Sequence, residues 1–208
     1  MKTTMLVFSL FALSSLPLVA VFLFARKRGS DFGFGRFLLA ATAGICAVLP
    51  VLAVQSLLPQ PGNRFALLLF RAFFVAALVE ESGKYLALFL VRRHLGGVGN
   101  AVLSGLTVSL GFALFETISY ASADPGIAFV RAFTAAPLHA ACGVWLGRAV
   151  HLPPLPATGR FAFALLVHGS YDLVLSVSGF PIAVPIILAF AALVLALGSE
   201  GKSLSTSS

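Results

Sequence analysis

Two adjacent carboxylates and a lysine stand in the middle of an apolar run that is long enough to cross a bilayer. The run extends from Phe65 to Val91, and its centre reads Val-Glu-Glu-Ser-Gly-Lys-Tyr over residues 79–85. A charged side chain at bilayer depth costs about 2.5–3.5 kcal/mol or more, and this run contains Glu80, Glu81 and Lys84. Such charges usually face the interior of a helix bundle and mark a site. Any fold for this chain must therefore bury this segment and provide partners for its charges.

The remainder of the chain is equally apolar. Of the 208 residues, 59% are hydrophobic and 10% are charged, and the mean hydropathy is +1.02. A water-soluble domain of this size needs a more highly charged surface. The apolar runs predict an all-α, polytopic membrane bundle of about seven transmembrane helices. These runs cover residues 5–25, 37–58, 65–91, 98–122, 127–147, 161–178 and 181–197.

Basic residues predict the orientation of the bundle. With the N-terminus outside and the C-terminus in the cytoplasm, nine Lys and Arg residues fall on the cytoplasmic side and two, Lys2 and Arg64, on the other, as the positive-inside rule requires. The net charge of +7 is spread over the ends of the apolar runs, so it indicates membrane orientation and no nucleic-acid partner. Cys46 and Cys142 lie in apolar runs and outside any CxxC pattern, so they predict no disulfide framework.

Nine charged or histidine side chains remain inside the predicted spans: Arg71, Glu80, Glu81, Lys84, Glu116, Arg131, His139, His168 and Asp172. At 1.5 Å per residue, the two glutamates of the third span lie roughly 15 to 18 Å from the cytoplasmic end of their helix. His139 lies roughly 12 Å in, His168 roughly 10 Å and Asp172 roughly 16 Å. Three helices are therefore expected to bring carboxylates and imidazoles to one layer in the inner half of the membrane.

Spacing adds orientation to depth. Glu80 and Glu81 point about 100° apart on a helix, so they cannot have the same role. Lys84 lies four and three residues after them, and Asp172 lies four residues after His168, so each of these sets shares a helix face.

Glu116 is the in-span acid with two open interpretations. It is deeper than the other acids, roughly 25 Å from the cytoplasmic end of its helix. At that depth it lies nearer to Arg71 and Arg131 than to the predicted layer. Either it belongs to the site or it only neutralises one of these arginines.

Four short motifs follow one another on successive spans. They are EExxK at 80–84, FxxxE at 112–116, HxxxG at 139–143 and HxxxD at 168–172. With these four motifs in this order on successive apolar spans, the chain resembles the PrsW family of bacterial intramembrane proteases. It is similar, more distantly, to the type II CAAX prenyl endopeptidases and to bacteriocin-processing membrane proteases. The resemblance covers roughly residues 65–178.

The resemblance implies hydrolysis of a peptide bond within the membrane, with the glutamate pair and the histidines as the working groups. In the best-known members of the family the reaction is the site-1 cleavage of a single-span anti-sigma factor. The prenyl endopeptidases have a histidine where this chain has Glu116 and an asparagine where it has Asp172, which favours the PrsW branch. The resemblance also implies an integral protein of the bacterial cytoplasmic membrane. We expect one catalytic transmembrane domain over residues 1–198 and a polar, disordered cytoplasmic tail over residues 199–208.

The predicted catalytic set is Glu80, Glu81, Lys84, Glu116, His139, His168 and Asp172. Hydrolysis needs a base to activate water and donors for the oxyanion, and we expect Glu80 or Glu81 to be the base. His139 and His168 either hold the water and the oxyanion directly or ligate a metal. In the second case Glu81, His139 and His168 would bind one divalent ion, most plausibly zinc. The chain has no HExxH motif, so a metal-free mechanism stays open.

Three other functions are compatible with the same residues. A CAAX-like or bacteriocin-processing endopeptidase is the nearest alternative. An ion- or proton-coupled transporter also places acids and histidines in membrane helices, although it would typically show inverted repeats or helices broken near the acids. A catalytically silent scaffold that binds a single-span partner through the same groove is the third.

Overall fold

A computed structural model describes residues 2–59, 61–123, 125–177 and 181–205, and these ranges contain helices and connections but no strand. The long helices are α1 (Lys2–Lys27), α2 (Phe34–Leu57), α5 (Ala101–Ala123), α6 (Pro125–Ala149), α7 (Pro154–Ser176) and α8 (Ala183–Ser205). The remaining rod consists of α3 (Arg64–Leu69), the π-helix η1 (Phe70–Leu78) and α4 (Val79–Val91). Two short 3₁₀ turns, η2 (Arg92–His94) and η3 (Val98–Asn100), connect this rod to α5. The predicted all-α fold is confirmed.

In the described residues, seven helical rods correspond in order to the seven predicted apolar runs, and the largest differences are at the start of α7 and the end of α8. α7 begins at Pro154, seven residues before the predicted start at Phe161. The Pro153–Pro156 cluster was expected to be a turn, but proline is well tolerated in the first turn of a helix, where its missing N–H group needs no partner. α8 continues to Ser205, so the tail predicted to be disordered is helical over residues 199–205. Residues 206–208 lie outside the described ranges.

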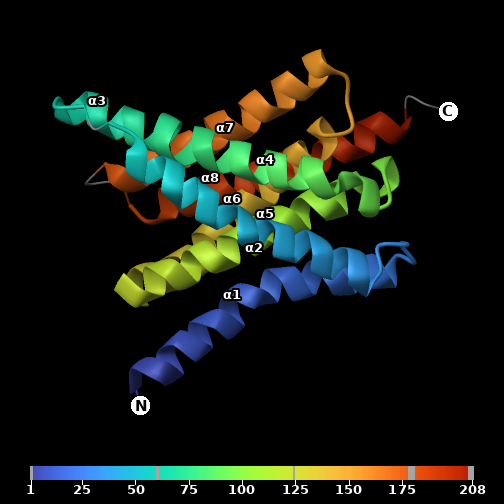
Figure 1. Cartoon of the computed structure of the whole chain (residues 1–208), viewed down its shortest axis with the longest axis horizontal. Helices are drawn as coiled ribbons and strands as arrows, with labels where there is room; N and C mark the ends of the chain where they lie inside the picture. The colour runs from blue at the N-terminus through green and yellow to red at the C-terminus, as the bar shows by residue number, and fades with distance from the viewer. Residues whose placement is uncertain (1, 60, 124, 178–180, 206–208) are drawn as a thin grey trace.

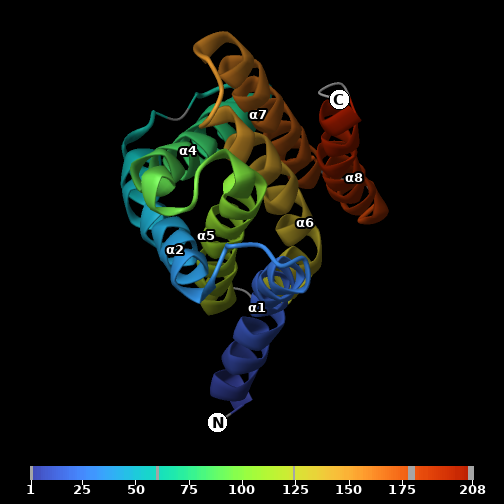
Figure 2. The same cartoon turned by 90° about the vertical axis from the view of Figure 1, so that its right-hand side faces the viewer.

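α5 occupies the centre of the bundle. It packs against α6, α2 and α1, and Figure 2 shows it surrounded by α1, α2, α4 and α6. α8 lies at the edge of the bundle, beside α6 and α7 (Figure 2), and the first half of α1 extends away from the other helices (Figure 1). This arrangement places the rod that contains Glu80 and Glu81 between α2 and α7, next to the buried α5.

Small residues permit the most extensive helix contact, between α5 and α6. A Cβ atom added at Gly105 would collide with the backbone of Gly143 and Gly147. One added at Gly143 would in turn collide with the backbone of Gly105. The GxxxG pair at 143 and 147 therefore serves helix packing, as is typical of such pairs in membranes.

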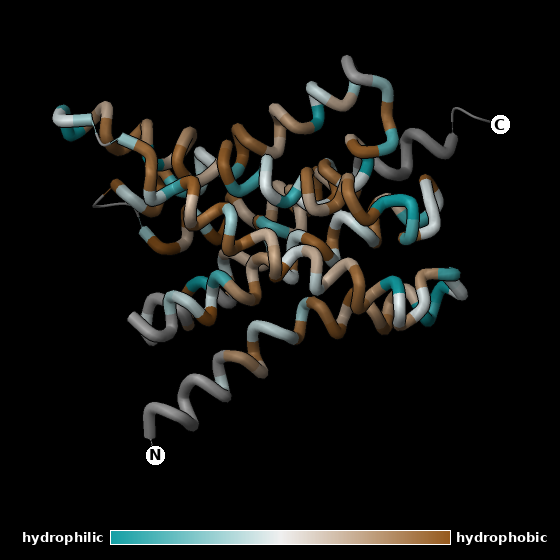
Figure 3. The backbone as a smooth tube through the Cα atoms, in the orientation of Figure 1, coloured by the Kyte–Doolittle hydropathy of each residue, from teal (hydrophilic) through white to brown (hydrophobic). Residues whose placement is uncertain are grey.

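Apolar side chains cover the outside of the bundle. Figure 3 shows hydrophobic residues along most of each described helix and hydrophilic ones mainly at the connections. Large side chains on the outer face of α8 are exposed, including Ile187, Val194 and Leu195 at 62–69%, which would be unfavourable in water. By length and hydropathy, two of the described helical segments could span a bilayer, Phe34–Leu57 and Val98–Tyr120. These features agree with a membrane protein, and the number of seven spans and their orientation stay predictions.

A polar contact fixes the connection between α1 and α2 against the start of α5. Asn100, which is buried, donates a hydrogen bond to Asp31 Oδ1 at 2.6 Å, and Arg36 forms an ion pair with Asp31 Oδ2 at 2.5 Å. The hydrogen bond from Arg36, followed by that from Asn100, lowers the pKa of the Asp31 carboxyl group below its usual value. This contact holds α2 in place at the end of the bundle where the rod also turns towards α5.

Candidate active site

The π-helix η1 sets the direction of the two glutamates. A π-helix has wider turns than an α-helix, with i→i+5 hydrogen bonds, and η1 covers the nine residues before Val79. Glu80 and Glu81 follow it in the first turn of α4. The amide of Gln55 on α2 donates a hydrogen bond to the backbone carbonyl of Val75 in η1 at 3.0 Å. A π-helix next to charged residues is often found at a functional site.

Glu81 lies at one end of the polar cluster and is fully buried. Its Oε1 accepts a hydrogen bond from Lys84 Nζ at 2.5 Å and contacts His168 Nδ1 at the same distance. Lys84 is fully buried too, and its ammonium lies 4.8 Å from the ring centroid of Phe112. Lys84 Nζ also lies 2.9 Å from His139 Nδ1. Glu81 and Lys84 thus connect the two histidines.

Glu116 lies at the other end of the cluster and pairs with two groups from α6. Its Oε1 accepts from Arg131 at 2.5 Å, and its Oε2 lies 3.1 Å from His139 Nε2. Both interpretations of Glu116 therefore have support in the geometry, because it neutralises Arg131 and also contacts a predicted site histidine. Arg71, the other arginine considered, lines a cavity beside Glu80 and Glu116.

Glu80 points in a different direction from Glu81, as the 100° offset predicts. Its Oε1 accepts a hydrogen bond from Gln55 at 3.3 Å, while its Oε2 lies 3.7 Å from His168 Nε2. Oε2 is buried and has no hydrogen-bond partner among the residues that the structure describes. A buried carboxylate oxygen without a partner is costly and indicates a place for a water molecule or a cation.

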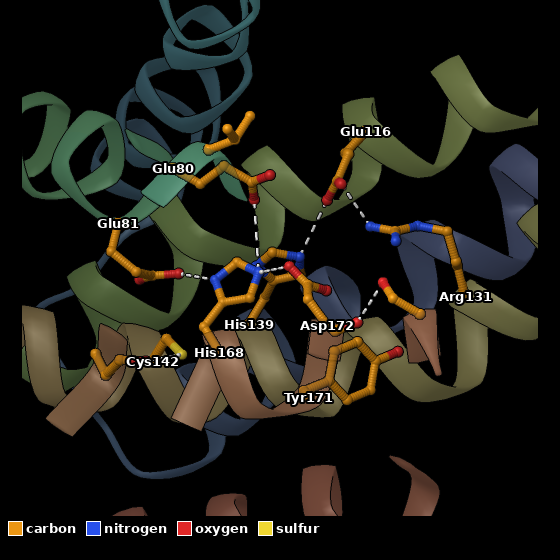
Figure 4. Close-up of polar contacts among 12 residues, drawn as sticks. Glu80, Glu81, Glu116, Arg131, His139, Cys142, His168, Tyr171 and Asp172 are labelled. Atoms are coloured by element: carbon orange, nitrogen blue, oxygen red, sulfur yellow. Dashed lines mark hydrogen bonds and ion pairs between the residues drawn. The ribbon is translucent and has the colours of Figure 1, made fainter. Parts of the chain in front are cut away.

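His168 is the centre of the arrangement in Figure 4, with acidic groups on both sides of its ring. Its Nδ1 faces Glu81, and its Nε2 lies 3.4 Å from Asp172 Oδ2, one helical turn away, and near Glu80. The rings of His139 and His168 meet edge to face with centroids 5.2 Å apart. Tyr171, the neighbour of Asp172, donates a hydrogen bond to Thr134 at 2.6 Å and so docks α7 on α6.

The charges of the cluster do not balance. Four carboxylates, from Glu80, Glu81, Glu116 and Asp172, face three cations, Lys84, Arg131 and Arg71, the last of which lines the cavity beside Glu80 and Glu116. If all of them are ionised and the imidazoles are neutral, one negative charge remains. A divalent cation, a protonated histidine or a protonated carboxyl group would supply the difference.

The donor atoms fit a metal ion. Glu80, His139 and His168 each offer one ligand atom, and these three atoms lie within 4.8 Å of one another. All three residues are buried. Two imidazoles and a carboxylate form a common catalytic zinc set. Both ring nitrogens of His139 are already within hydrogen-bonding distance of Lys84 and Glu116, so a metal would compete with one of those contacts.

This donor group differs from the predicted ligand set. Glu80, rather than Glu81, lies with both histidines. The oxygens of Glu81 are instead near His168 and Cys142, in a second group of potential ligands. The Cys142 thiol, however, donates to the carbonyl of Ala164 at 3.6 Å, as a packing residue would. Which residue of the pair faces the histidines depends on the tertiary contacts of the rod, and spacing alone could not predict it.

A cavity of about 460 Å³ leads from the surface to the cluster. Its walls come from α2, η1 and α5, and Glu80, Glu116 and Gln55 are among its lining residues. Gln55, which lines the cavity and donates a hydrogen bond to Glu80, is not among the residues predicted from the sequence. The signal that could have identified it is a polar side chain inside the second apolar run.

Comparisons with known proteins agree with this geometry. Residues 32–197 match the model of a family described as PrsW family intramembrane metalloprotease. The chain is 31% identical to Protease PrsW of Bacillus subtilis over 149 residues, which covers 64% of this chain and 66% of that protein. It is 30% identical to Protease PrsW of Shouchella clausii over 147 residues, covering 65% of this chain and 68% of the relative. The chain thus spans about two thirds of the length of these relatives. No solved structure gives a significant match.

Proposed function

Because this chain belongs to the PrsW family of intramembrane metalloproteases, we propose that it hydrolyses a peptide bond of a membrane-protein substrate within the bilayer. One observation carries the proposal. Buried acids and imidazoles from α4, α5, α6 and α7 form one continuous polar network, and a cavity connects it to the surface. A single-span anti-sigma factor, in the bacterial cytoplasmic membrane, is the substrate that the family resemblance suggests.

Glu80 is the proposed general base. It lines the cavity, and its Oε2 has no hydrogen-bond partner among the described residues. Glu81 Oε2 also has none, but Glu81 does not line the cavity, and its Oε1 is engaged by Lys84 and His168. In the proposed step a water oxygen adds to the scissile carbonyl carbon while Glu80 Oε2 accepts the proton of that water. The same carboxyl group then donates the proton to the amide nitrogen as the C–N bond breaks. The products are a carboxylic acid and an amine.

The other members of the predicted set support this step. Glu81 and Asp172 each face one nitrogen of His168, which fixes the orientation of the ring beside Glu80. Lys84 and Glu116 do the same for His139. Water and peptide groups in the cavity would then meet preorganised partners, which is the main source of transition-state stabilisation in such sites.

The family description includes a metal, and we propose that Glu80, His139 and His168 would hold it. A bound divalent ion, most plausibly zinc, would supply Lewis-acid polarisation of the scissile carbonyl. The uncompensated negative charge of the network is consistent with such an ion.

The experiment that tests the proposal is comparative proteomics of membranes from wild-type cells and cells carrying Glu80→Gln. We expect at least one membrane protein to be shortened in the wild type and to keep its full length in the variant, at equal levels of this chain. Identical membrane proteomes in both strains, under conditions where this chain is expressed, would contradict the proposal.

Gln55→Ala is expected to slow cleavage by about 10- to 100-fold. The variant removes a hydrogen bond to a charged group, worth about 1.5–3 kcal/mol, and frees both Glu80 and the η1 carbonyl of Val75 from their contact with α2. The effect should fall on kcat and leave KM nearly unchanged, since Gln55 would position the base. The matched control is Ser56→Ala, because Ser56 is exposed and bonds only within its own helix. Equal kcat values for both variants would exclude a positioning role.

A further inference from the structure

Among the cavities of the described residues, the one next to Glu80 reaches the polar network. Two larger cavities, of about 550 and 530 Å³, lie between α2 and α4 and between α1, α5, α6 and α8. Their lining residues include none of the acids or histidines of the site. The cavity of about 460 Å³ is lined by Glu80 and Glu116 and passes between α2, η1 and α5. We call it the entry groove.

The opening of the entry groove carries an apolar and a charged side chain. Leu52 and Arg71 line the groove and both are exposed, Leu52 at 47%. Both belong to helical rods predicted to cross the membrane, and α2 has a mean hydropathy of 2.4 over its most apolar window. Acyl chains rather than water are therefore expected outside this opening, so an occupant would come from within the bilayer.

The walls of the entry groove have two chemical characters. Val48, Val51 and Val75 provide apolar contacts, whereas Gln55, Arg71 and Tyr120 provide polar or charged groups. A lipid tail cannot form hydrogen bonds with the polar groups, whereas an extended peptide has both apolar side chains and unpaired backbone N–H and C=O groups. The mixed lining therefore favours a peptide over an acyl chain.

The size of the entry groove limits the form of that peptide. A helix about 10 Å wide with a 5.4 Å pitch fills roughly 420 Å³ per turn, so a cavity of about 460 Å³ holds about three or four residues. An intact transmembrane helix does not fit. A short stretch that has left its helix does, and its exposed backbone is also what a protease must reach.

From these observations we infer that the entry groove binds a short extended segment of a membrane-spanning substrate, which enters sideways between α2 and η1. This inference rests on the proposed function, because it identifies where the substrate of that reaction binds. Leu52 lies at the opening, Glu80 at the inner end, and Gln55 and Tyr120 beside the peptide backbone.

The test uses a photo-crosslinking amino acid at position 52 and, as the matched control, at position 49. Leu49 lies on the same helix and is 64% exposed, but it does not line any of the described cavities. The probe is a doubly tagged single-span membrane protein that wild-type cells cleave and Glu80→Gln cells do not. In the Glu80→Gln background, position 52 should crosslink to the intact probe and position 49 should not.

A second measurement uses cleavage of the same probe. Leu52→Trp should slow cleavage by about tenfold or more, because the bulk at the opening keeps the segment from its position near Glu80. Leu49→Trp should change the rate by about twofold or less. Normal cleavage by Leu52→Trp together with equal crosslinking at both positions, or crosslinks from position 52 to lipid alone, would overturn the inference and leave the protease proposal intact. Failure of the protease proposal would be seen separately, as an uncleaved probe in wild-type cells.

Discussion

Glu80→Gln is expected to reduce the rate of substrate cleavage by about 10²–10⁴-fold. The glutamine keeps the shape of the side chain but cannot accept a proton from water, so the base of the proposed step is lost. Its amide can still contact Gln55, and Glu80 makes only a long contact of 3.7 Å with His168, whereas Glu81 is paired directly with the buried Lys84. The variant should therefore accumulate in the membrane at the wild-type level.

Two histidine variants extend this prediction. His139→Ala and His168→Ala should each abolish detectable cleavage, because both rings lie beside Glu80 in the donor group. The measurement is the fraction of a tagged substrate cleaved after a fixed time, normalised to the amount of enzyme in the membrane. Near-wild-type cleavage by Glu80→Gln and by both histidine variants would end the hydrolase proposal for this site.

Glu81→Gln separates a structural role from a chemical one. Glu81 and Lys84 are both fully buried and paired at 2.5 Å. Removing one charge of a buried pair typically costs about 3–5 kcal/mol, because the partner is left uncompensated. We therefore expect Glu81→Gln to lose activity and to accumulate less than Glu80→Gln. Equal amounts of both variants in the membrane would contradict the structural role given to Glu81.

The second large effect concerns metal content. The protein purified in detergent should contain about one equivalent of a divalent metal, most plausibly zinc, and His139→Ala or His168→Ala should lose it. Removal of the metal by a chelator should stop cleavage and also lower the melting temperature, since a ligand that binds the folded state stabilises it. Metal analysis by mass spectrometry and a thermal melt measure these effects independently of activity.

Cys142→Ser distinguishes the two groups of potential ligands. If Glu80, His139 and His168 hold the metal, this variant keeps its full metal content. If Glu81, Cys142 and His168 hold it, the metal content falls. An enzyme that is metal-free as purified, and remains active in the presence of a chelator, would contradict both assignments and favour glutamate chemistry without a metal.

The helical rods were predictable because burial in a bilayer requires long apolar runs, and loops interrupt these runs with polar and turn residues. All seven predicted runs correspond to helical rods with shifted ends. The start of α7 was misplaced because a proline cluster is compatible with both a turn and a first helical turn. The π-helix η1 could not be predicted, since its wider turns depend on neighbours such as Gln55 rather than on local periodicity.

The sequence predicted that the polar residues of the site would cluster, but it could not predict their individual contacts. The signal for the site was the presence of charged residues and histidines inside apolar runs. Their predicted depth along the helices placed most of them in one layer of the membrane. The contact between His168 and Asp172 follows from their spacing on one helix. The partners of Glu80 and Glu81 depend on how α4 is rotated against α2 and α7, which the tertiary packing decides. Gln55 went unnoticed because an uncharged polar residue in a membrane helix is more often structural.

The central claim is that this buried network hydrolyses peptide bonds in a bilayer. The most direct measurement places the purified chain in liposomes with a doubly tagged single-span substrate taken from the membrane comparison, and follows both fragments by gel and mass spectrometry. We predict that the wild type produces two fragments whose masses sum to that of the substrate plus one water, and that Glu80→Gln produces none. An intact substrate with wild-type enzyme, accompanied by proton or solute flux across the liposome membrane, would contradict the claim and identify a transporter.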